Sequence, residues 1–377
     1  MVKYKDQRMN PFKYGTVVSG RDFCGRKELL KQLKNYIESS QNIVLFGERR
    51  IGKTSAACEA ARRLKTARPL YIDLLGIKSI DTLCRRILRS CVMLEQKSGM
   101  IERIIKSLSS LRPSFTLDPI TAMPTVTFDA SIELKANSIP EVLTVIESLH
   151  GKKRTVVILD EFQDVLNINE AQEALALLRG KIQFQTDIPY IFIGSIRHKL
   201  SEIFTHHESP FFKSAIPISI EPIPYEEFSN FLKNKFADGK KVISNETLSN
   251  IFQMADNVSG DIQQLCESIW SVSSAGERIG QEHILKGLEL IFSREQKSYE
   301  NYITLLTNNQ QKVLRAIALA GGKNVYSVSF LKSSGFNNPS SVRKAINRMI
   351  SLNILFEKAG EYKFINPFFR AWLLARG

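Results

Sequence analysis

The chain lacks several features that mark particular classes of protein. It has no run of about 18 apolar residues, the length that a helix needs to cross a membrane. Its first ten residues are polar and lack the apolar segment of a secretory signal. The five cysteines are scattered, without a Cys-x-x-Cys pair, which argues against structural zinc and against a disulfide framework. We therefore expect a cytoplasmic protein that has no membrane partner.

Acidic side chains are in the minority, and the basic excess is unevenly placed. The 377 residues include 52 Lys and Arg against 38 Asp and Glu, a formal net charge of +14. Residues 1–40 carry +5 and residues 300–377 carry +8, whereas residues 41–299 carry only +1. A clustered basic surface attracts phosphate polymers or anionic membranes, although charge of this kind also serves solubility alone.

Short apolar runs alternate with helical periodicity over the first 220 residues. Buried strands are expected at 43–46, 70–74, 155–160, 190–194 and 215–220. Helices are expected at 26–39, 53–67, 79–108, 139–150 and 169–180. Residues 109–138 are rich in Ser, Thr and Pro and alternate over 124–132, which predicts a β-hairpin or a loop insertion. Strands that alternate with helices predict a parallel sheet covered on both faces.

The pattern changes after residue 224, where every periodic segment is helical. The expected helices lie at 225–237, 244–256, 260–275 and 281–292, followed by a linker helix at 293–305. We therefore divide the chain into an α/β core (1–222), a small helical domain with its linker (223–305) and a third unit (306–377).

A phosphate-binding motif lies between the first strand and the helix after it. Gly47–Thr54 matches G-x-x-x-x-G-K-[ST], and the strand before it and the helix after it are the required context. Glycines let the loop curl so that backbone N–H groups face phosphates, and the helix N-terminus adds positive potential. Lys53 would reach the β- and γ-phosphates, and Thr54 would ligate Mg²⁺. The expected nucleotide-binding residues here are Gly47, Glu48, Arg49, Arg50, Ile51, Gly52, Lys53, Thr54 and Ser55.

A second element of the site is the pair of carboxylates that ends the strand at 155–160. Asp160 would lie beside the phosphate-binding loop and hold Mg²⁺ through water, with Thr54 as its fellow ligand. Glu161 is placed to polarise an attacking water, together with Lys53 as a catalytic group. A glutamate beside the Mg²⁺ aspartate favours water over a small molecule as the phosphoryl acceptor, so the sequence predicts an ATPase.

These residues, in this order, resemble the AAA+/STAND superfamily of P-loop ATPases. The chain is most similar to the archaeal-type ATPase family, which is related to the origin-recognition initiators. The further matching segments are Asn10–Phe12, Phe23–Glu28, Leu111–Phe128, Ile193–Ser195 and Asn366–Trp372. The resemblance covers nearly the whole chain.

The resemblance carries implications for both fold and site. It implies an AAA+-like sheet with strand order 5-1-4-3-2, a helical lid over residues 223–305 and a winged helix at the C-terminus. It places Gly25 and Arg26 in a box that lies against the adenine of ATP. It makes Ser195 a sensor near the γ-phosphate, although a serine at a strand end also commonly caps the next segment.

Two departures from the family pattern concern hydrolysis. The lid has Gln263 where many relatives have a sensor arginine, so the arginine is missing. Ahead of the fifth strand stands Lys213, a point charge without the bidentate fork of arginine. Lys213 or Arg197 would act as a finger on the nucleotide of a neighbouring subunit, or else is a plain surface charge. The departures predict either slow hydrolysis or the use of nucleotide as a conformational switch.

Residues 308–377 have the pattern of a winged helix. Helices are expected at 309–319, 328–334 and 341–352, then a hairpin at 354–358 and 362–365, then a closing helix from Pro367. The third helix has an apolar face of Val342, Ala345, Ile346, Met349 and Ile350. Its other face carries Ser340, Arg343, Lys344, Asn347 and Arg348. These residue types suit the major groove of DNA, but a solvated face of a protein-contact domain has the same composition.

The sequence thus supports two functions. In the first, ATP and Mg²⁺ set the state of an ATPase that acts on double-stranded DNA through its winged helix. In the second, the same nucleotide switch serves signalling or defence, and its winged helix binds a protein partner. Binding of ADP and assembly into a homo-oligomer are compatible with both.

Overall fold

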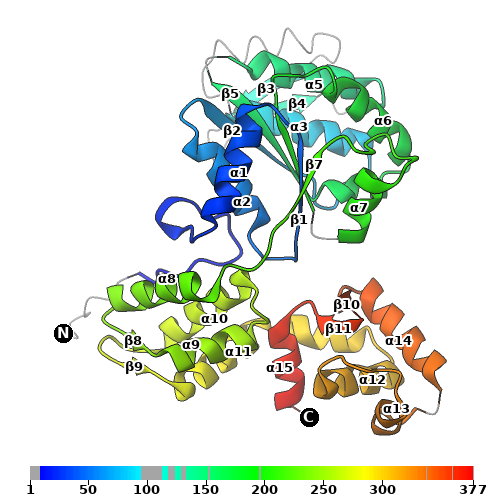
Figure 1. Cartoon of the computed structure of the whole chain (residues 1–377). Coiled ribbons are helices and arrows are strands. Elements are labelled where there is room, and N and C mark those ends of the chain that lie inside the picture. The colour runs from blue at the N-terminus through cyan, green and yellow to red at the C-terminus, as the bar shows by residue number, and fades with distance from the viewer. Residues whose placement is uncertain are drawn as a thin grey trace. The chain divides into compact units, whose positions relative to one another are not determined.

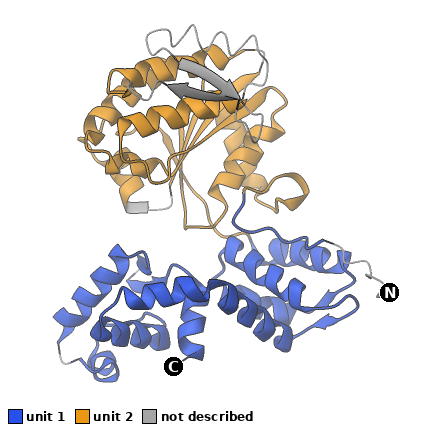
Figure 2. Ribbon diagram, turned by 180° about the vertical axis from the view of Figure 1, so that it is seen from behind, with its two compact units in different colours: residues 1–16, 224–377 blue, residues 17–223 orange. Residues whose placement is uncertain are grey.

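The computed structural model describes residues 9–94, 113–117, 124–128, 133–151, 153–194, 197–336, 338–358 and 360–376. The chain forms two compact units (Figure 2), which are residues 17–223 and residues 1–16 together with 224–377. The sequence placed residues 1–16 with the α/β core, whereas the contacts of the described residues 9–16 group them with the C-terminal part of the chain. The three-part division at 222 and 305 stays a prediction.

The 17–223 unit is built on a five-stranded parallel sheet (Figure 1). The strands are β1 (Ile43–Phe46), β2 (Ala67–Asp73), β5 (Arg154–Asp160), β6 (Tyr190–Ile193) and β7 (Ile216–Ser219). Their order is β2-β5-β6-β1-β7, and every neighbouring pair is parallel. Numbered along the chain, this is the predicted order 5-1-4-3-2, so the predicted fold class is confirmed.

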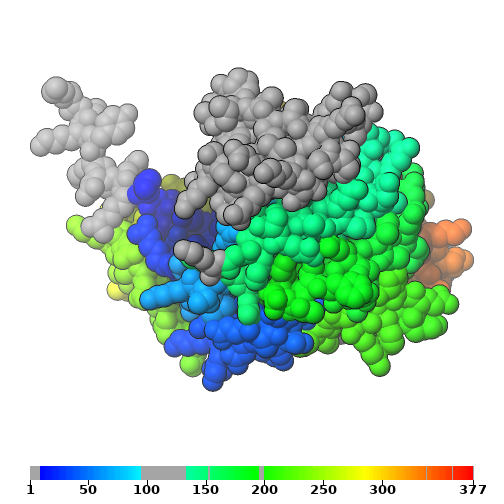
Figure 3. Space-filling view, turned by 90° about the horizontal axis from the view of Figure 1, so that it is seen from above, coloured from blue at the N-terminus to red at the C-terminus, as the bar shows by residue number. Residues whose placement is uncertain are grey.

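Helices cover both faces of this sheet. On one face lie α1 (Lys27–Glu38) and α2 (Lys53–Arg63), which pack on Ile43 and Leu45 of β1. On the other face lie α3 (Ile80–Leu94), α5 (Ser138–Leu149), α6 (Ala171–Ile182) and α7 (Arg197–Thr205), around Val44 and Phe46. Residues of α5 and α6 form a continuous outer surface, teal to green in Figure 3. The central strands β1 and β6 are buried along their whole length, and both are apolar throughout.

Two local expectations in this unit were tested. The insertion contains β3 (Pro113–Leu117) and β4 (Pro124–Phe128), which pair antiparallel as the predicted hairpin. The helix expected over 53–67 ends at Arg63, because Ala67 already pairs with Arg154 in the sheet. The part of the 79–108 helix beyond residue 94 lies outside the described residues.

The first part of the second unit is mostly helical. It contains α8 (Tyr225–Asp238), α9 (Asn245–Met254), α10 (Ser259–Val272) and α11 (Gln281–Thr304). The expectation of a separate linker helix at 293–305 is wrong, because α11 runs without a break for 24 residues. The all-helical expectation also missed β8 (Val242–Ile243) and β9 (Arg278–Ile279), two short strands that pair in parallel.

The last part of the chain has the predicted order of a winged helix. Its elements are α12 (Asn308–Ala320), α13 (Val328–Ser334), α14 (Pro339–Ser351), β10 (Leu355–Lys358), β11 (Glu361–Phe364) and α15 (Pro367–Ala375). Phe369 and Trp372 of α15 pack against Tyr299 of α11, with ring centroids 5.2 and 5.5 Å away. These aromatic rings are therefore core residues. Within the described ranges, no helix is long and apolar enough to span a bilayer.

Candidate functional site

The phosphate-binding loop joins the carboxyl end of β1 to the start of α2. Gly52 has φ 95°, in the left-handed region that favours glycine, and Arg50 has φ 62°. A Cβ on Gly47 would lie 3.1 Å from the carbonyl oxygen of Ile220, at the end of the neighbouring strand. Ile51 is buried in the core beneath the loop. The loop is therefore a close turn, in which Gly52 supplies a left-handed backbone conformation and Gly47 a tight approach to Ile220.

Lys53 folds back over the loop that precedes it. Its ammonium donates to the carbonyl oxygens of Gly47, at 3.1 Å, and Glu48, at 2.8 Å. Burial lowers the pKa of Lys53 to about 8, although the carboxylates of Glu161 and Asp160 act in the opposite direction. The charged group is thus held at the place where the motif expects the outer phosphates of a nucleotide.

The structure brings together Thr54 and Asp160, which are 106 residues apart in the chain. The hydroxyl of Thr54 donates to Asp160 Oδ2 at 2.6 Å. The hydroxyl of Tyr71, on β2, donates to the same oxygen at 3.1 Å. Burial raises the pKa of Asp160, and the hydrogen bond from Thr54 opposes the rise. This carboxylate is the strand-end acid that the sequence predicts beside the loop.

The oxygen atoms of Thr54 and Asp160 suit a magnesium ion. Mg²⁺ prefers oxygen ligands and usually combines one or two protein groups with water and substrate phosphates. In the described part of the chain, no group of three or more His, Cys, Asp and Glu residues is arranged to hold a metal by itself. The residues present therefore fit an ion that binds together with a nucleotide.

Glu161 follows Asp160 in a constrained conformation. Its φ is 53°, which is uncommon for a residue other than glycine, and its N–H donates to Asp160 Oδ1 at 3.0 Å. Its carboxylate accepts a hydrogen bond of 2.6 Å from Nε2 of the buried Gln163. A Cβ on Gly194, at the end of β6, would collide with Gln163 Oε1. The orientation of Glu161 thus depends on Gln163, which sequence reasoning missed, and on the close approach of Gly194 to that side chain.

The expected N-terminal box contacts the loop through Arg26. Its guanidinium donates to the carbonyl oxygens of Ile51, at 2.7 Å, and Glu221, at 2.6 Å. Gly25 and Arg26 both have positive φ, 68° and 59°. These contacts tie the loop to the chain beyond β7, so Arg26 braces the loop in this structure.

Glu59 of α2 links the segment that precedes this box to the loop's helix. It is fully buried and accepts hydrogen bonds from Arg62, Arg63 and the N–H of Gly20. Burial opposes ionisation, but the three donors outweigh it and lower the pKa of Glu59 to about 2. Nearby, Ser55 Oγ accepts from the N–H of Val18 at 3.1 Å. Sequence reasoning missed Glu59, because an acid within a helix is more often solvated.

Four other residues were expected to influence hydrolysis, and the structure describes the side chains of two of them. Ser195 lies outside the described residues, and so does the side chain of Arg197. Gln263, at the position of the missing lid arginine, is buried in α10. Lys213 has φ 51°, and its ammonium lies 5.1 Å from the centre of the Phe212 ring.

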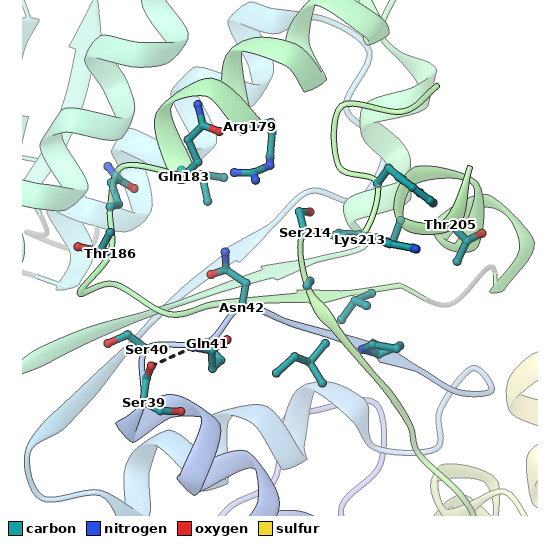
Figure 4. A pocket seen from close by; sticks show the side chains of 18 of the residues that line it. Ser39, Ser40, Gln41, Asn42, Arg179, Gln183, Thr186, Thr205, Lys213 and Ser214 are labelled. Carbon is teal, nitrogen blue, oxygen red and sulfur yellow. Dashed lines mark hydrogen bonds between the residues drawn. The ribbon is translucent and has the colours of Figure 1, made fainter. Parts of the chain in front are cut away.

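Lys213 also lines a cavity of about 790 Å³ (Figure 4). The cavity lies where β1 and β7 begin, beside Asn42, Ser214 and the end of α6. Arg179 of α6 is its second cation, and its described lining contains no Asp or Glu. Because the phosphate-binding loop follows the other end of β1, this cavity is distinct from it. Lys213 therefore lies at the edge of the sheet opposite the one that carries the phosphate-binding loop of the same chain.

The expected nucleic-acid residues share the exposed face of α14, whose apolar face is buried. The exposed residues are Ser340, Arg343, Lys344, Asn347 and Arg348. The guanidinium of Arg343 lies 5.5 Å from the centre of the Tyr326 ring. The hydroxyl of Tyr326 is 3.0 Å from that of Tyr362, on the second strand of the wing. This cluster joins the basic helix to the wing.

Comparison with known proteins decides the family. Residues 23–265 match the model of the family described as "ATPase domain predominantly from Archaea". The chain belongs to this family of ATPases. Residues 297–375 of the ATPase also match the model described as "Probable winged helix domain". No curated protein was found to match it in sequence.

Solved structures with the same fold accompany this match. The ATPase is similar to a Walker-type ATPase of Pyrococcus abyssi, with 18% identity, a TM-score of 0.65, and 97% of this chain and 99% of that chain covered. It is also similar to the Orc1 protein of Aeropyrum pernix, solved in complex with DNA, with 12% identity and a TM-score of 0.51. That match covers 94% of this chain and 93% of the Orc1 chain. At these identities the likeness concerns the fold.

Proposed function

We propose that this ATPase binds and hydrolyses ATP and uses the nucleotide state as a switch on double-stranded DNA. The observation that carries the proposal is the convergence of four groups at the carboxyl edge of the sheet. These groups are the ammonium of Lys53, the hydroxyl of Thr54 and the carboxylates of Asp160 and Glu161. Their distances and burial suit phosphate binding followed by attack of water.

Each group has a distinct role in this proposal. Residues 47–55 hold the phosphates, and Lys53 stabilises charge on the β- and γ-phosphates. Thr54 and Asp160 hold Mg²⁺, which neutralises phosphate charge when it is bound. Glu161 accepts a proton from the attacking water, and its hydrogen bond from Gln163 keeps it in position. Gly25 and Arg26 contribute to the adenine side, and Ser195 to the γ-phosphate side.

The DNA part of the proposal rests on the winged helix. The face of α14 that carries Arg343, Lys344 and Arg348 is exposed, and residues 300–377 carry a net charge of +8. Arg and Asn side chains on such a helix can contact base edges, and Lys can contact phosphates. The fold likeness to an Orc1 protein solved with DNA supports the same reading. The proposal includes a cytoplasmic location. It also allows a homo-oligomer or a protein partner beside the DNA.

Two substitutions test the ATPase part. Lys53→Ala removes the cation that binds the outer phosphates, so nucleotide binding is expected to be abolished in an equilibrium titration. Glu161→Gln keeps the size of the side chain but removes the base, so ATP binding is expected to persist while phosphate release stops. Turnover by Glu161→Gln at the wild-type rate would show that Glu161 is not the group that activates water.

A further inference from the structure

Tyr71 lies beside the proposed magnesium site, although no motif includes it. In the register of β2 and β5, Tyr71 lies opposite Ile158 and Asp73 lies opposite Asp160. Side chains alternate along a strand, so Tyr71, Ile158 and Asp160 share one face of the sheet. Ile158 packs in the core under α1 and α2, which identifies that face as the one facing the loop's helix. The Tyr71 hydroxyl therefore reaches Asp160 from the neighbouring strand.

Three donors fix the Asp160 carboxylate, and each comes from a different element. Oδ2 accepts from Thr54 at 2.6 Å and from Tyr71 at 3.1 Å. Oδ1 accepts from the N–H of Glu161 at 3.0 Å. Thr54 and the Glu161 backbone belong to the proposed nucleotide site. Tyr71 instead donates from the neighbouring strand β2. It acts on the same oxygen as the proposed magnesium ligand Thr54.

We propose that Tyr71 is a positioning residue that orients Asp160 toward Thr54 and thereby sets the affinity of the nucleotide site for Mg²⁺. This inference rests on the proposed binding of Mg²⁺ with ATP. Partners that hydrogen-bond to metal-ligating carboxylates typically change metal affinity 10- to 100-fold when they are removed. Tyr71 is 38% exposed, so its contribution to the core is limited.

The test is Tyr71→Phe, which keeps the ring and removes only the hydroxyl. The matched control is Tyr225→Phe in the other unit, where the hydroxyl donates to the Asn245 carbonyl at 3.0 Å and the residue is 39% exposed. The dissociation constant of a fluorescent ATP analogue is measured for each full-length protein with saturating Mg²⁺ and again in EDTA. The ratio of the two constants reports the benefit from Mg²⁺ without reference to turnover.

We expect Tyr71→Phe to lower the Mg²⁺ benefit about tenfold and to raise the midpoint of a Mg²⁺ titration, with binding in EDTA unchanged. Tyr225→Phe should match the wild type in all three measurements. A wild-type Mg²⁺ benefit in Tyr71→Phe would overturn the inference. Equal weakening with and without Mg²⁺ would also overturn it, because that result indicates a structural role. Absence of nucleotide binding by the wild type would instead contradict the proposed function.

Discussion

Glu161 is the residue whose geometry depends most on its surroundings. A φ of 53° is uncommon for glutamate and persists only where neighbouring contacts hold the backbone. Here the Glu161 N–H bonds to Asp160, and the side chain bonds to Gln163. These two hydrogen bonds hold the backbone and the carboxylate of Glu161 in one arrangement, as the proposed general base requires.

A substitution at Gly194 tests whether Gln163 holds Glu161 in position. A methyl group in Gly194→Ala would collide with Gln163 Oε1 and push the Gln163 amide away from Glu161. We expect ATP turnover to fall about tenfold, the cost of a mispositioned general base, while ATP binding is unchanged. The control is Gly180→Ala, because a Cβ on Gly180 meets no atom within 4 Å. Unchanged turnover in Gly194→Ala would contradict the role of Gln163.

The ion pairs of Glu59 lead to a prediction about how the free energy of unfolding depends on pH. Its pKa of about 2 in the folded chain lies below the ordinary value of 4.5, so its contribution is fully present above pH 4.5 and disappears as the pH falls toward 2. Glu59→Gln should lower the free energy of unfolding by about 1–2 kcal/mol at pH 7, because both guanidinium partners are half-exposed and screened. Urea unfolding at pH 7 and pH 3 measures this. The gap between variant and wild type should narrow at pH 3, and a constant gap would contradict the assignment.

The motif residues of the site could be predicted from sequence, and their supporting residues could not. The spacing of Lys53 and Thr54 is local, and Asp160 ends an apolar strand, so both signals can be read along the chain. Tyr71 and Gln163 act through sheet register and tertiary packing, which one sequence does not display. The sequence offers one signal for Tyr71. It lies two residues before Asp73 in the predicted strand 70–74, so the two side chains share one face of that strand.

At the scale of elements, most errors concerned boundaries. Helical periodicity continues through Phe292, so no local signal decides between one helix and two, and α11 proved to be continuous. The two-residue strands β8 and β9 are too short for an alternating pattern to appear. β1, which has a strong apolar run, was predicted with its observed bounds, and the bounds of β6 were predicted to within one residue.

The wing depends on a close approach at Gly322, in the loop after α12. Gly322 has φ 79°, its carbonyl accepts from the N–H of Tyr362 at 3.0 Å, and a Cβ would collide with the Tyr362 carbonyl oxygen. Gly322→Ala should therefore destabilise the winged helix by about 2–4 kcal/mol, since backbone strain adds to the collision.

Gly335→Ala is the matched control for this prediction. Gly335 has φ 74°, but a Cβ there meets no atom within 4 Å, so only the backbone cost of about 1 kcal/mol is expected. Thermal unfolding of the two variants separates the collision from the strain. Equal melting temperatures for the two variants would show that the wing does not rest on this contact.

At the scale of the whole molecule, the basic residues at the two ends of the chain have different surroundings. Within the +5 at the N-terminus, Arg26 is engaged with carbonyl oxygens around the phosphate-binding loop. Within the +8 at the C-terminus, Arg343, Lys344 and Arg348 share one exposed helix face. Placement, more than total charge, favours a nucleic-acid partner for the winged helix.

The order of the sheet could be predicted at this scale through the resemblance to a family. The grouping of residues 9–16 with the second unit could not, because it depends on contacts between distant parts of the chain. Asn10 Nδ2 donates to the carbonyl oxygen of Glu267 at 3.0 Å, and the Phe12 ring lies 4.7 Å from that of Phe236. No local pattern in the first 16 residues indicates these partners.

The central claim is that nucleotide state controls binding to DNA, and a duplex titration tests it most directly. The affinity of the full chain for duplex DNA is measured with Mg²⁺-ATP, with ADP and without nucleotide, at 50 to 200 mM salt. Contacts to about four to six phosphates predict a slope of about −4 to −5 in log affinity against log salt. We expect the affinities with and without ATP to differ at least fivefold, the lower end of typical coupling between sites. No binding in ATP at 50 mM salt would contradict the account and favour a protein partner.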